Sequence, residues 1–254
     1  MKKGALFLVP APLDFGCEEK TSLDQVLPDA TLRAAARLSH WVCENARSTR
    51  AYLNRINAIH PLAHPLQQQQ MVELPRHIHK KGDHDGQFDA RSLLAPALDG
   101  HDIGLISEAG MPAIADPGSS VVRAAHAQDI RVVPLVGPVS LLLALAASGL
   151  NGQNFAFVGY LPQDATQRKQ RAQELETLAR STGQTQLFIE TPYRNVAMLT
   201  ALLASLAPGT RLSVSSGITL AEARTRCATI AEWREEPASG APGNATPAVF
   251  AIGV

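Results

Sequence analysis

The chain has 254 residues, of which 45% are hydrophobic and 18% charged, and its 23 basic side chains balance 23 acidic ones. This length accommodates one large or two small α/β domains. The balanced charge excludes a strong overall attraction to nucleic acid or to an anionic membrane surface, so any phosphate-binding surface must be a local patch.

The cysteines and apolar segments exclude several further classes of protein. Cys17, Cys43 and Cys227 show neither Cys-x-x-Cys spacing nor a Cys/His ligand pattern, so neither a disulfide framework nor a metal site is expected. The apolar run that Pro10 ends is too short for a secretion signal, and residues 135–150 are too few and too interrupted to span a bilayer. We therefore expect a cytoplasmic protein without a membrane segment.

The first 89 residues begin with a regular pattern and end in a polar stretch. The continuous apolar run at 5–9 predicts a strand buried on both faces of a sheet. Helical spacing predicts a helix over 23–38, a short strand follows at 41–43, and a second helix starts near Ser48 with Ser or Thr as its cap. Residues 60–89 are mainly polar and contain five of the eight histidines.

The pattern then becomes that of a crossover unit. A strand at 103–106, a helix at 119–128 and a strand at 130–135 follow one another, which predicts parallel pairing of the two strands. Asp116 is expected to cap the helix, and Pro138 to open the next helix, which runs through Ala147.

The second half alternates in the same way, which predicts an α/β fold throughout. The expected strands are 155–159, 185–189, 211–215 and 248–254, and the expected helices are 165–180 and 195–206. We place the domain boundary so that the N-terminal α/β domain covers 1–136 and the C-terminal α/β domain covers 137–254.

Two turns follow predicted strands and carry the residues suited to a ligand site. Ile106–Gly118 lies at the carboxyl end of a parallel strand, where open α/β sheets bind ligands, and its small residues permit close backbone approach. A tight strand-to-helix turn without a ligand is the alternative. Gly137-Pro138 also follows a strand, and simple initiation of a helix is the alternative there.

Five motifs in a fixed order resemble the tetrapyrrole methylase superfamily over nearly the whole chain. They are Leu6–Pro12, Ile106–Gly118, Gly137–Ser140 with Ser148–Leu150, Gly159–Pro162 and Glu190–Arg194. The branch that they resemble most is the bacterial small-subunit ribosomal RNA (cytidine-2'-O-)-methyltransferase I. The resemblance implies two α/β domains with mixed sheets, a cofactor cleft between them, and a homodimer.

The resemblance also implies an S-adenosylmethionine-dependent methyltransferase. Carried over by position, the donor-binding residues would be Pro10, Ser107, Glu108, Ala109, Gly110, Met111, Ile114, Val139, Ser140 and Leu161. This donor carries a sulfonium and no phosphate, which is why no G-x-G-x-x-G loop is needed.

The residues expected to face the methyl acceptor depart from the pattern of the branch. Asn45 and Ala46 replace Asp and Thr of its Glu-Asp-Thr-Arg, Tyr193 replaces a His, and Ser216–Leu220 lacks three charges. Glu108 and Val136 replace Asp and Pro, and Asp14-Phe15-Gly16 replaces its Gly-Asn-Leu. The chain is therefore expected to be a divergent relative.

Methyl transfer to a ribose hydroxyl needs alignment and a base or an orienting hydrogen bond. Candidate bases are Glu44, Glu108 and Glu190, and Arg47 or Arg194 would orient a phosphate or carboxylate. The catalytic set predicted is Glu44, Arg47 and Arg194; surface ion pairs and turn-satisfying carboxylates are the alternatives.

Two further polar segments are candidate substrate contacts. The histidine-rich stretch 77–85 lacks ordered metal-ligand spacing and is expected to be a basic loop that faces the substrate rather than a metal site. Arg168, Lys169 and Arg171 form a basic cluster that either contacts RNA or is a solvated helix face.

Three functions remain open from the sequence. The first is 2'-O-methylation of a cytidine in small-subunit ribosomal RNA, with that RNA or the small subunit as the partner. The second is methylation of a small molecule such as a tetrapyrrole. The third is binding of S-adenosylmethionine without catalysis.

Overall fold

The computed structural model describes residues 2–14, 16–81, 83–237 and 239–254. Phe15 and Gly82, which belong to two of the segments singled out above, lie outside the described residues. The chain divides into two compact units, Met1–Gly16 with Lys20–Pro138 and Cys17–Glu19 with Val139–Val254. The domain boundary predicted at 136/137 lies two residues before this division.

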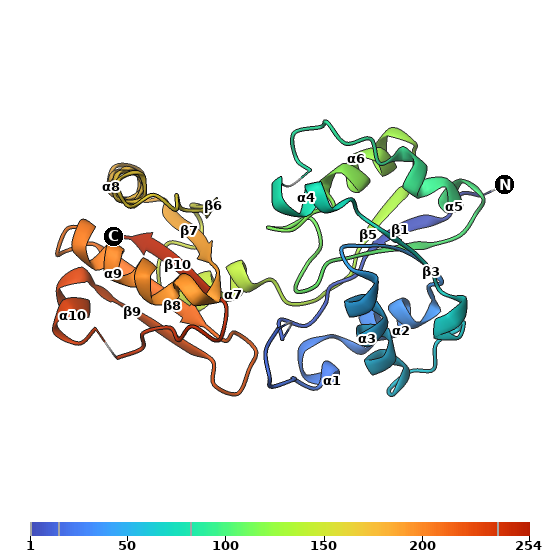
Figure 1. Ribbon diagram of the computed structural model, residues 1–254, viewed down its shortest axis with the longest axis horizontal. Coiled ribbons are helices and arrows are strands. Elements are labelled where there is room, and N and C mark those ends of the chain that lie inside the picture. The colour runs from blue at the N-terminus through green and yellow to red at the C-terminus, as the bar shows by residue number, and fades with distance from the viewer. Residues whose placement is uncertain (1, 15, 82, 238) are drawn as a thin grey trace. The chain divides into compact units, whose positions relative to one another are not determined.

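The first unit is built on a five-stranded sheet in the order β3-β2-β4-β1-β5 (Figure 1). The strands are β1 (Ala5–Leu8), β2 (His40–Cys43), β3 (Gln70–Glu73), β4 (Ile103–Ile106) and β5 (Arg131–Pro134). Every pair is parallel. The carboxyl ends of all five strands therefore lie at one edge of the sheet, which is where ligands bind in open parallel sheets.

Helices cover both faces of this sheet because successive side chains of a strand point to opposite faces. Trp41 and Cys43 pack with the α2–α3 side, whereas Val42 packs with the α6 side. The helical segments are α1 (Leu23–Val26), α2 (Asp29–Arg37), α3 (Ala46–Asn57), η1 (Leu66–Gln68), α4 (Arg76–Lys81), η2 (Arg91–Leu94), α5 (Ala95–Leu98) and α6 (Ser119–Ala127).

Two helix predictions in this unit were wrong in detail. The helix expected over 23–38 is two helices, because Pro28 has no N–H to continue the first one and stands at the start of α2. The second helix is capped by Asn45 rather than by Ser or Thr: its side chain accepts from the amides of Arg47 and Ser48.

One strand-pairing prediction was also wrong, and one strand was not predicted. β4 and β5 are parallel, but β1 lies between them, so the crossover spans a strand instead of joining neighbours. The polar stretch 60–89 contains β3 and α4. β3 was not predicted because it is an exposed edge strand. Gln69, which precedes it, is buried, and its Oε1 accepts from Trp41 Nε1 at 2.8 Å.

The second unit is built on a mixed five-stranded sheet in the order β6-β7-β10-β8-β9. Its strands are β6 (Phe155–Tyr160), β7 (Thr185–Glu190), β8 (Arg211–Ser216), β9 (Arg224–Thr229) and β10 (Ala248–Gly253). β6 and β7 are parallel, and the other pairs are antiparallel. The α/β fold class is thus confirmed, and the mixed pairing belongs to this second sheet.

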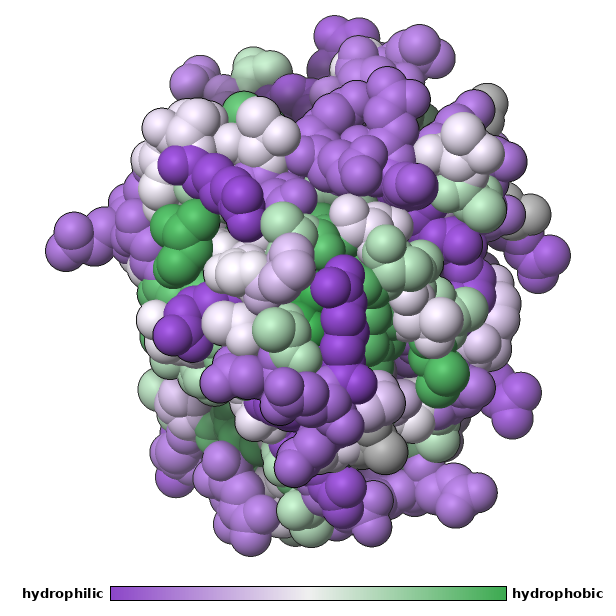
Figure 2. All heavy atoms as spheres, turned by 90° about the vertical axis from the view of Figure 1, so that its left-hand side faces the viewer, coloured by the Kyte–Doolittle hydropathy of each residue, from purple (hydrophilic) through white to green (hydrophobic). Residues whose placement is uncertain are grey.

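The two faces of the second sheet have different helices. Phe188, Val214 and Phe250 pack against α8 (Ala165–Thr182), α9 (Asn195–Ser205) and α10 (Ile230–Glu235). Leu187 and Val249 pack instead against α7 (Ser140–Ser148) on the opposite face. Seen from the side of α8, α9 and α10, the surface is mainly hydrophilic, with small hydrophobic areas between polar ones (Figure 2).

Several boundaries in this unit differ from the sequence prediction. Pro138 does not open α7, which starts at Ser140 with Val139 as its N-cap. Strand β9, which lies between polar segments, was not predicted. Helix α10 was not predicted either; its N-terminus is capped by a capping box between Thr229 and Glu232. Among the described residues, no helix is both long enough and apolar enough to cross a bilayer.

Candidate functional site

The loops that follow β1 and β4 are joined by a short backbone pairing. The amide of Ala11 donates to the carbonyl of Gly110 at 2.9 Å, and the amide of Gly110 donates back at 3.1 Å. Gly110 has φ +67°, and a Cβ there would lie 3.2 Å from Leu13 Cδ2. Glycine is therefore favoured at position 110, where the two loops meet.

Two residues of the turn 107–118 that are not glycines also have a strained backbone. Ala113 and Ala115 have φ of 66° and 62°, a left-handed conformation that costs a residue with a Cβ about 1–2 kcal/mol each. The amide of Ala113 donates to Pro117 at 3.3 Å, which closes the turn on itself. Such strain persists only where the surroundings fix it, and it is concentrated at functional sites.

The far end of this turn is fixed by Asp83, and the prediction that Asp116 caps α6 was wrong. The Asp83 carboxylate accepts from the amides of Gly118, Ser119 and Ser120 at 3.0, 3.2 and 2.9 Å, and from both serine hydroxyls. Burial alone would raise the pKa of Asp83, but the hydrogen bonds from Ser120 and Ser119 outweigh it and lower this pKa. The N-terminus of α6 is thus occupied by a carboxylate of the chain itself.

Asp83 belongs to the histidine-rich stretch, which is only partly a loop. Residues Arg76–Lys81 form α4, and Asp83 follows as an anchor for α6. The role of a basic loop facing the substrate stays a prediction. Within residues 2–14, 16–81, 83–237 and 239–254, no group of three His, Cys, Asp or Glu side chains is arranged to hold a metal ion.

Three carboxylates gather at the carboxyl edge of the first sheet. Glu44 directly follows β2, and Glu108 is the second residue after β4. Glu44 accepts through Oε2 from the amide of Glu108 at 3.2 Å. Burial, together with the negative charges of Glu44 and Glu108, raises the pKa of Asp116 to about 7. A carboxyl group with that pKa exchanges its proton near neutral pH, and the other two give this edge a negative potential.

Pro10 is held in place by contacts that the sequence did not indicate. Its carbonyl accepts from the Tyr52 hydroxyl at 2.9 Å. Burial raises the pKa of Tyr52, so the hydroxyl stays a donor. A Cβ on Gly137 would come within 2.3 Å of the Pro10 ring, which explains the glycine before Pro138.

Arg47 stands in the first turn of α3 and is exposed. Its backbone amide donates to the capping Asn45 at 2.9 Å. Over the described part of the chain, no hydrogen bond or ion pair of its guanidinium is found. Of the predicted charged residues, Arg47 therefore has the guanidinium best suited to an incoming anion.

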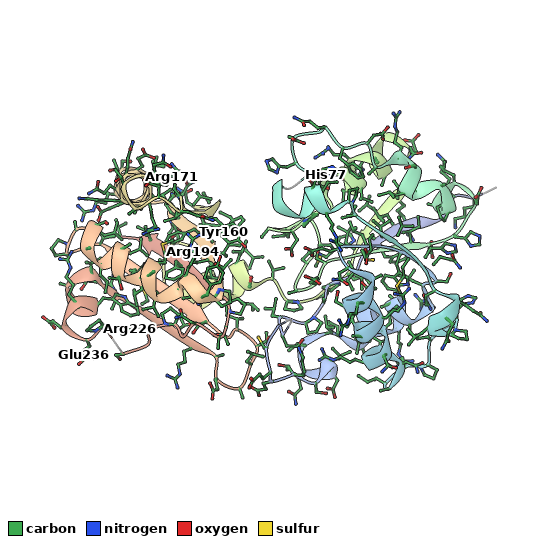
Figure 3. All side chains as sticks on the ribbon, in the orientation of Figure 1. His77, Tyr160, Arg171, Arg194, Arg226 and Glu236 are labelled. Carbon is green, nitrogen blue, oxygen red and sulfur yellow. The ribbon has the colours of Figure 1, made fainter. Side chains whose placement is uncertain are left out.

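Arg194 differs from Arg47 because it is already paired. Its Nη2 lies 2.7 Å from Glu190 Oε2, and the two side chains are 20% and 1% exposed. Glu190 also accepts through Oε1 from the Thr191 amide at 2.7 Å. Tyr193, between them in the chain, is 70% exposed. Figure 3 labels Arg194 with Tyr160 and Arg171 in the second unit.

The residues that the sequence predicts to bind the donor lie in both units. Val139 caps α7 and Ser140 begins it. Leu161 is a core residue, 3% exposed and packed with α8 and α9, so only its backbone could contact a ligand. Pro10, Ser107, Ala109, Met111 and Ile114 lie in the two joined loops of the first unit.

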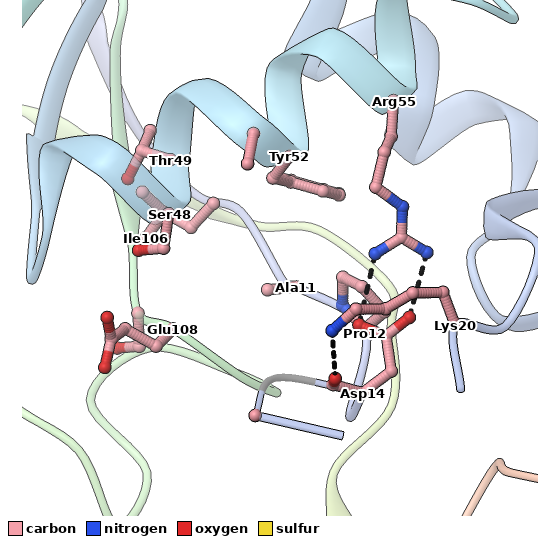
Figure 4. A pocket seen from close by; sticks show the side chains of 13 residues that line it. Ala11, Pro12, Asp14, Lys20, Ser48, Thr49, Tyr52, Arg55, Ile106 and Glu108 are labelled. Carbon is pink, nitrogen blue, oxygen red and sulfur yellow. Dashed lines mark hydrogen bonds and ion pairs between the residues drawn. The ribbon is translucent and has the colours of Figure 1, made fainter. Parts of the chain in front are cut away.

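The sequence did not reveal a pocket beside these loops. It is lined by the loop after β1, by one side of α3 and by Ile106–Glu108 (Figure 4). Asp14, whose side chain is 3% exposed, pairs there with Arg55 through two contacts of 3.1 and 2.9 Å. Arg55 Nη2 also donates to the Thr21 carbonyl at 2.6 Å, which fixes the loop after β1.

Comparison with known proteins identifies the family. The family profile described as Tetrapyrrole (Corrin/Porphyrin) Methylases matches residues 27–233. The chain belongs to this family. The methyltransferase CobJ has a similar structure, with a TM-score of 0.56 and 15% identity over 98% of this chain and 94% of that one. The uroporphyrin-III-C-methyltransferase of Thermus thermophilus gives 0.50 and 18% over 99% and 94%.

Two similar sequences carry the name Ribosomal RNA small subunit methyltransferase I. The protein of Pseudomonas aeruginosa is 34% identical over 194 residues, which is 76% of this chain and 59% of the relative. That of Halalkalibacterium halodurans is 33% identical over 195 residues, 76% of this chain and 57% of the relative. The chain therefore spans less than two thirds of the length of these relatives.

Proposed function

We propose that the chain is an S-adenosylmethionine-dependent methyltransferase that acts on small-subunit ribosomal RNA, at the 2'-hydroxyl of a cytidine. Membership of the family and the names of the similar sequences support this proposal. The observation that carries it is the backbone pairing of Ala11 with Gly110, which joins the two loops of the family's donor motifs beside a strained turn.

The residues at this edge suit the proposed donor. Glu44 and Glu108 give it a negative potential, which favours a sulfonium cation. The N-terminus of α6, a place where phosphates often bind, is filled by Asp83, and this donor needs no phosphate site. When bound, the donor would supply an activated methyl group for in-line displacement by a nucleophile.

On the acceptor side, the proposed catalytic set is Glu44, Arg47 and Arg194. Arg47 is the member with an exposed guanidinium, and it would position a phosphate of the RNA. Arg194 would act from its ion pair with Glu190. Homodimer formation and a cytoplasmic location stay predictions, and sedimentation of the purified chain would test the first.

Calorimetry with S-adenosylmethionine and S-adenosylhomocysteine tests the donor. Ser140→Trp, at the first residue of α7, is expected to abolish binding, whereas Ala147→Trp, exposed on the same helix, is expected to leave it intact. No heat of binding for the unsubstituted protein would refute the proposal.

The acceptor is tested in a strain that lacks the gene. Mass spectrometry of its small-subunit RNA is expected to show the loss of one 2'-O-methylcytidine, restored by the gene supplied in trans. Persistence of every methylated cytidine, in a strain without a second enzyme of this kind, would refute the RNA acceptor.

A further inference from the structure

The pocket between the loop after β1, α3 and the end of β4 has a size that limits what it holds. Its volume is about 240 Å³. Pockets that bury a whole drug-sized ligand typically measure roughly 300–1,000 Å³. A single flat ring system fits this volume, whereas the whole methyl donor does not.

The walls of the pocket are apolar. Ala11, Pro12, Ala51 and Ile106 contribute aliphatic surface, and Tyr52 contributes its ring. The Tyr52 hydroxyl is turned away to the Pro10 carbonyl, at 2.9 Å. Apolar walls of this kind suit the two faces of an aromatic ring.

The two ends of the pocket carry opposite hydrogen-bonding character. Glu108 lies at one end, and Lys20 and Arg55 lie at the other, with Asp14 between the two cations (Figure 4). A carboxylate only accepts hydrogen bonds, and its two oxygens can accept from more than one donor at a time. Lys20 donates one of its three N–H bonds to the Asp14 carbonyl, at 2.7 Å, so this end is a donor end.

We propose that this pocket binds a nucleobase that carries an exocyclic amino group. The amine would donate to Glu108, as cytosine N4 does to acidic side chains, and the ring acceptors would face Lys20 and Arg55. Uracil presents a carbonyl where cytosine has its amine, and the carboxylate would repel it. The inference rests on the proposed function, which offers two such bases: the cytosine of an RNA acceptor and the adenine of the donor.

Ala51→Phe is the variant designed to close the pocket. Ala51 is exposed on α3, so the larger side chain fills the pocket without entering the core. Asn54→Phe, exposed on the same helix outside the pocket lining, is the matched control. The probes are cytidine monophosphate, uridine monophosphate and S-adenosylhomocysteine, each titrated by calorimetry or by ligand-observed NMR.

If the occupant is the acceptor base, cytidine monophosphate is expected to bind the unsubstituted protein at least fivefold more tightly than uridine monophosphate, as one specific base contact of about 1–3 kcal/mol requires. Ala51→Phe is expected to weaken one probe at least tenfold, and Asn54→Phe neither. Loss of cytidine monophosphate alone assigns the pocket to the acceptor base, and loss of S-adenosylhomocysteine alone assigns it to the donor adenine. The proposal is overturned if Ala51→Phe changes neither affinity.

Glu108→Gln tests the end of the pocket that accepts hydrogen bonds, with the exposed Glu235→Gln as control. An amide both donates and accepts, so, for the acceptor base, the preference for cytidine over uridine is expected to fall to less than twofold. An unchanged preference overturns the role of Glu108. If the protein binds S-adenosylhomocysteine and methylates RNA while Ala51→Phe behaves as the unsubstituted chain, this inference alone fails; if the unsubstituted chain binds no donor, the proposed function fails.

Discussion

The Asp83 carboxylate accepts from the amide of Ser120 at 2.9 Å and from its hydroxyl, across 37 residues of chain. It thereby supplies the N-terminus of α6 with the cap that Gly118 lacks. The turn 107–118 ends at this cap, so Asp83 sets where the strained part of the candidate site finishes.

Asp83→Ala is expected to lower the free energy of unfolding by about 2 kcal/mol or more, because several buried donors lose their acceptor. Urea denaturation at pH 7 measures this change. Asp89→Ala, which removes an exposed carboxylate from the same region, is the control and should cost much less. Equal losses for the two variants would contradict the anchoring role.

The same residue gives the stability a dependence on acid pH. The folded pKa of Asp83 is lowered, so its contribution is present above the unfolded pKa of about 3.9 and is lost as the pH falls through the folded value. The difference between the unsubstituted protein and Asp83→Asn should therefore shrink below about pH 4. Denaturation at pH 7, 5 and 3 checks this, and a constant difference would contradict it.

Asp116 is expected to titrate near neutral pH. Its pKa is raised to about 7 by burial and by Glu44 and Glu108, so Glu108→Gln should lower the midpoint of Asp116 by removing one negative charge. Carboxyl-carbon NMR measures the midpoint. Glu73→Gln, whose carboxylate is engaged with the Ala46 amide, is the control.

The raised pKa of Asp116 also makes the free energy of unfolding depend on pH. The folded protein favours the protonated form, so the cost of ionising Asp116 appears as the pH rises from about 4 towards 7. Asp116→Asn should therefore be more stable than the unsubstituted chain at pH 8, by an amount on the order of 1–2 kcal/mol, and equal to it at pH 4. A larger stability advantage of Asp116→Asn over the unsubstituted chain at pH 4 than at pH 8 would contradict the sign.

The parts of the fold that follow local patterns were predictable. Ala5–Leu8 is a continuous apolar run and forms an interior strand of the first sheet, and the regular strand–helix spacing after residue 103 gives most later elements. β3 was missed because an exposed edge strand lacks a hydrophobic signature. The position of β1 between β4 and β5 is set by packing of distant segments and not by any local sequence.

The candidate site shows the same division. The turn 107–118 was found because its glycines and prolines follow a recognisable strand. The Asp14–Arg55 pair was missed because its members lie 41 residues apart, and neither residue is unusual in its own segment. Asp83 was hidden in a histidine-rich stretch that looked solvated, and only its contacts with α6 show its role.

The Asp14–Arg55 pair is expected to stabilise the pocket wall. Arg55→Met leaves a buried carboxylate without its cation, which typically costs about 3–5 kcal/mol for a fully buried pair and less here, because Arg55 is partly exposed. Asp14→Asn with Arg55→Met should cost less than the sum of the single changes. A double-mutant cycle by urea denaturation measures this coupling, and additive costs would contradict it.

Arg47 and Arg194 are expected to respond differently to the same substitution. Arg194→Met leaves Glu190 buried and unpaired, so its main effect should be on the free energy of unfolding, lowered by roughly 2–4 kcal/mol. Arg47 is exposed, so Arg47→Met should leave stability unchanged within about 0.5 kcal/mol.

If the proposed RNA acceptor is right, Arg47→Met should weaken RNA binding roughly five- to tenfold, and should reduce the slope of log affinity against log salt by about one. The exposed Arg37→Met, at the end of α2, is the control for a general loss of charge. Binding of a small-subunit RNA fragment at several salt concentrations measures the slope. An unchanged slope for Arg47→Met would show that its guanidinium does not contact a phosphate, because each neutralised phosphate releases counterions.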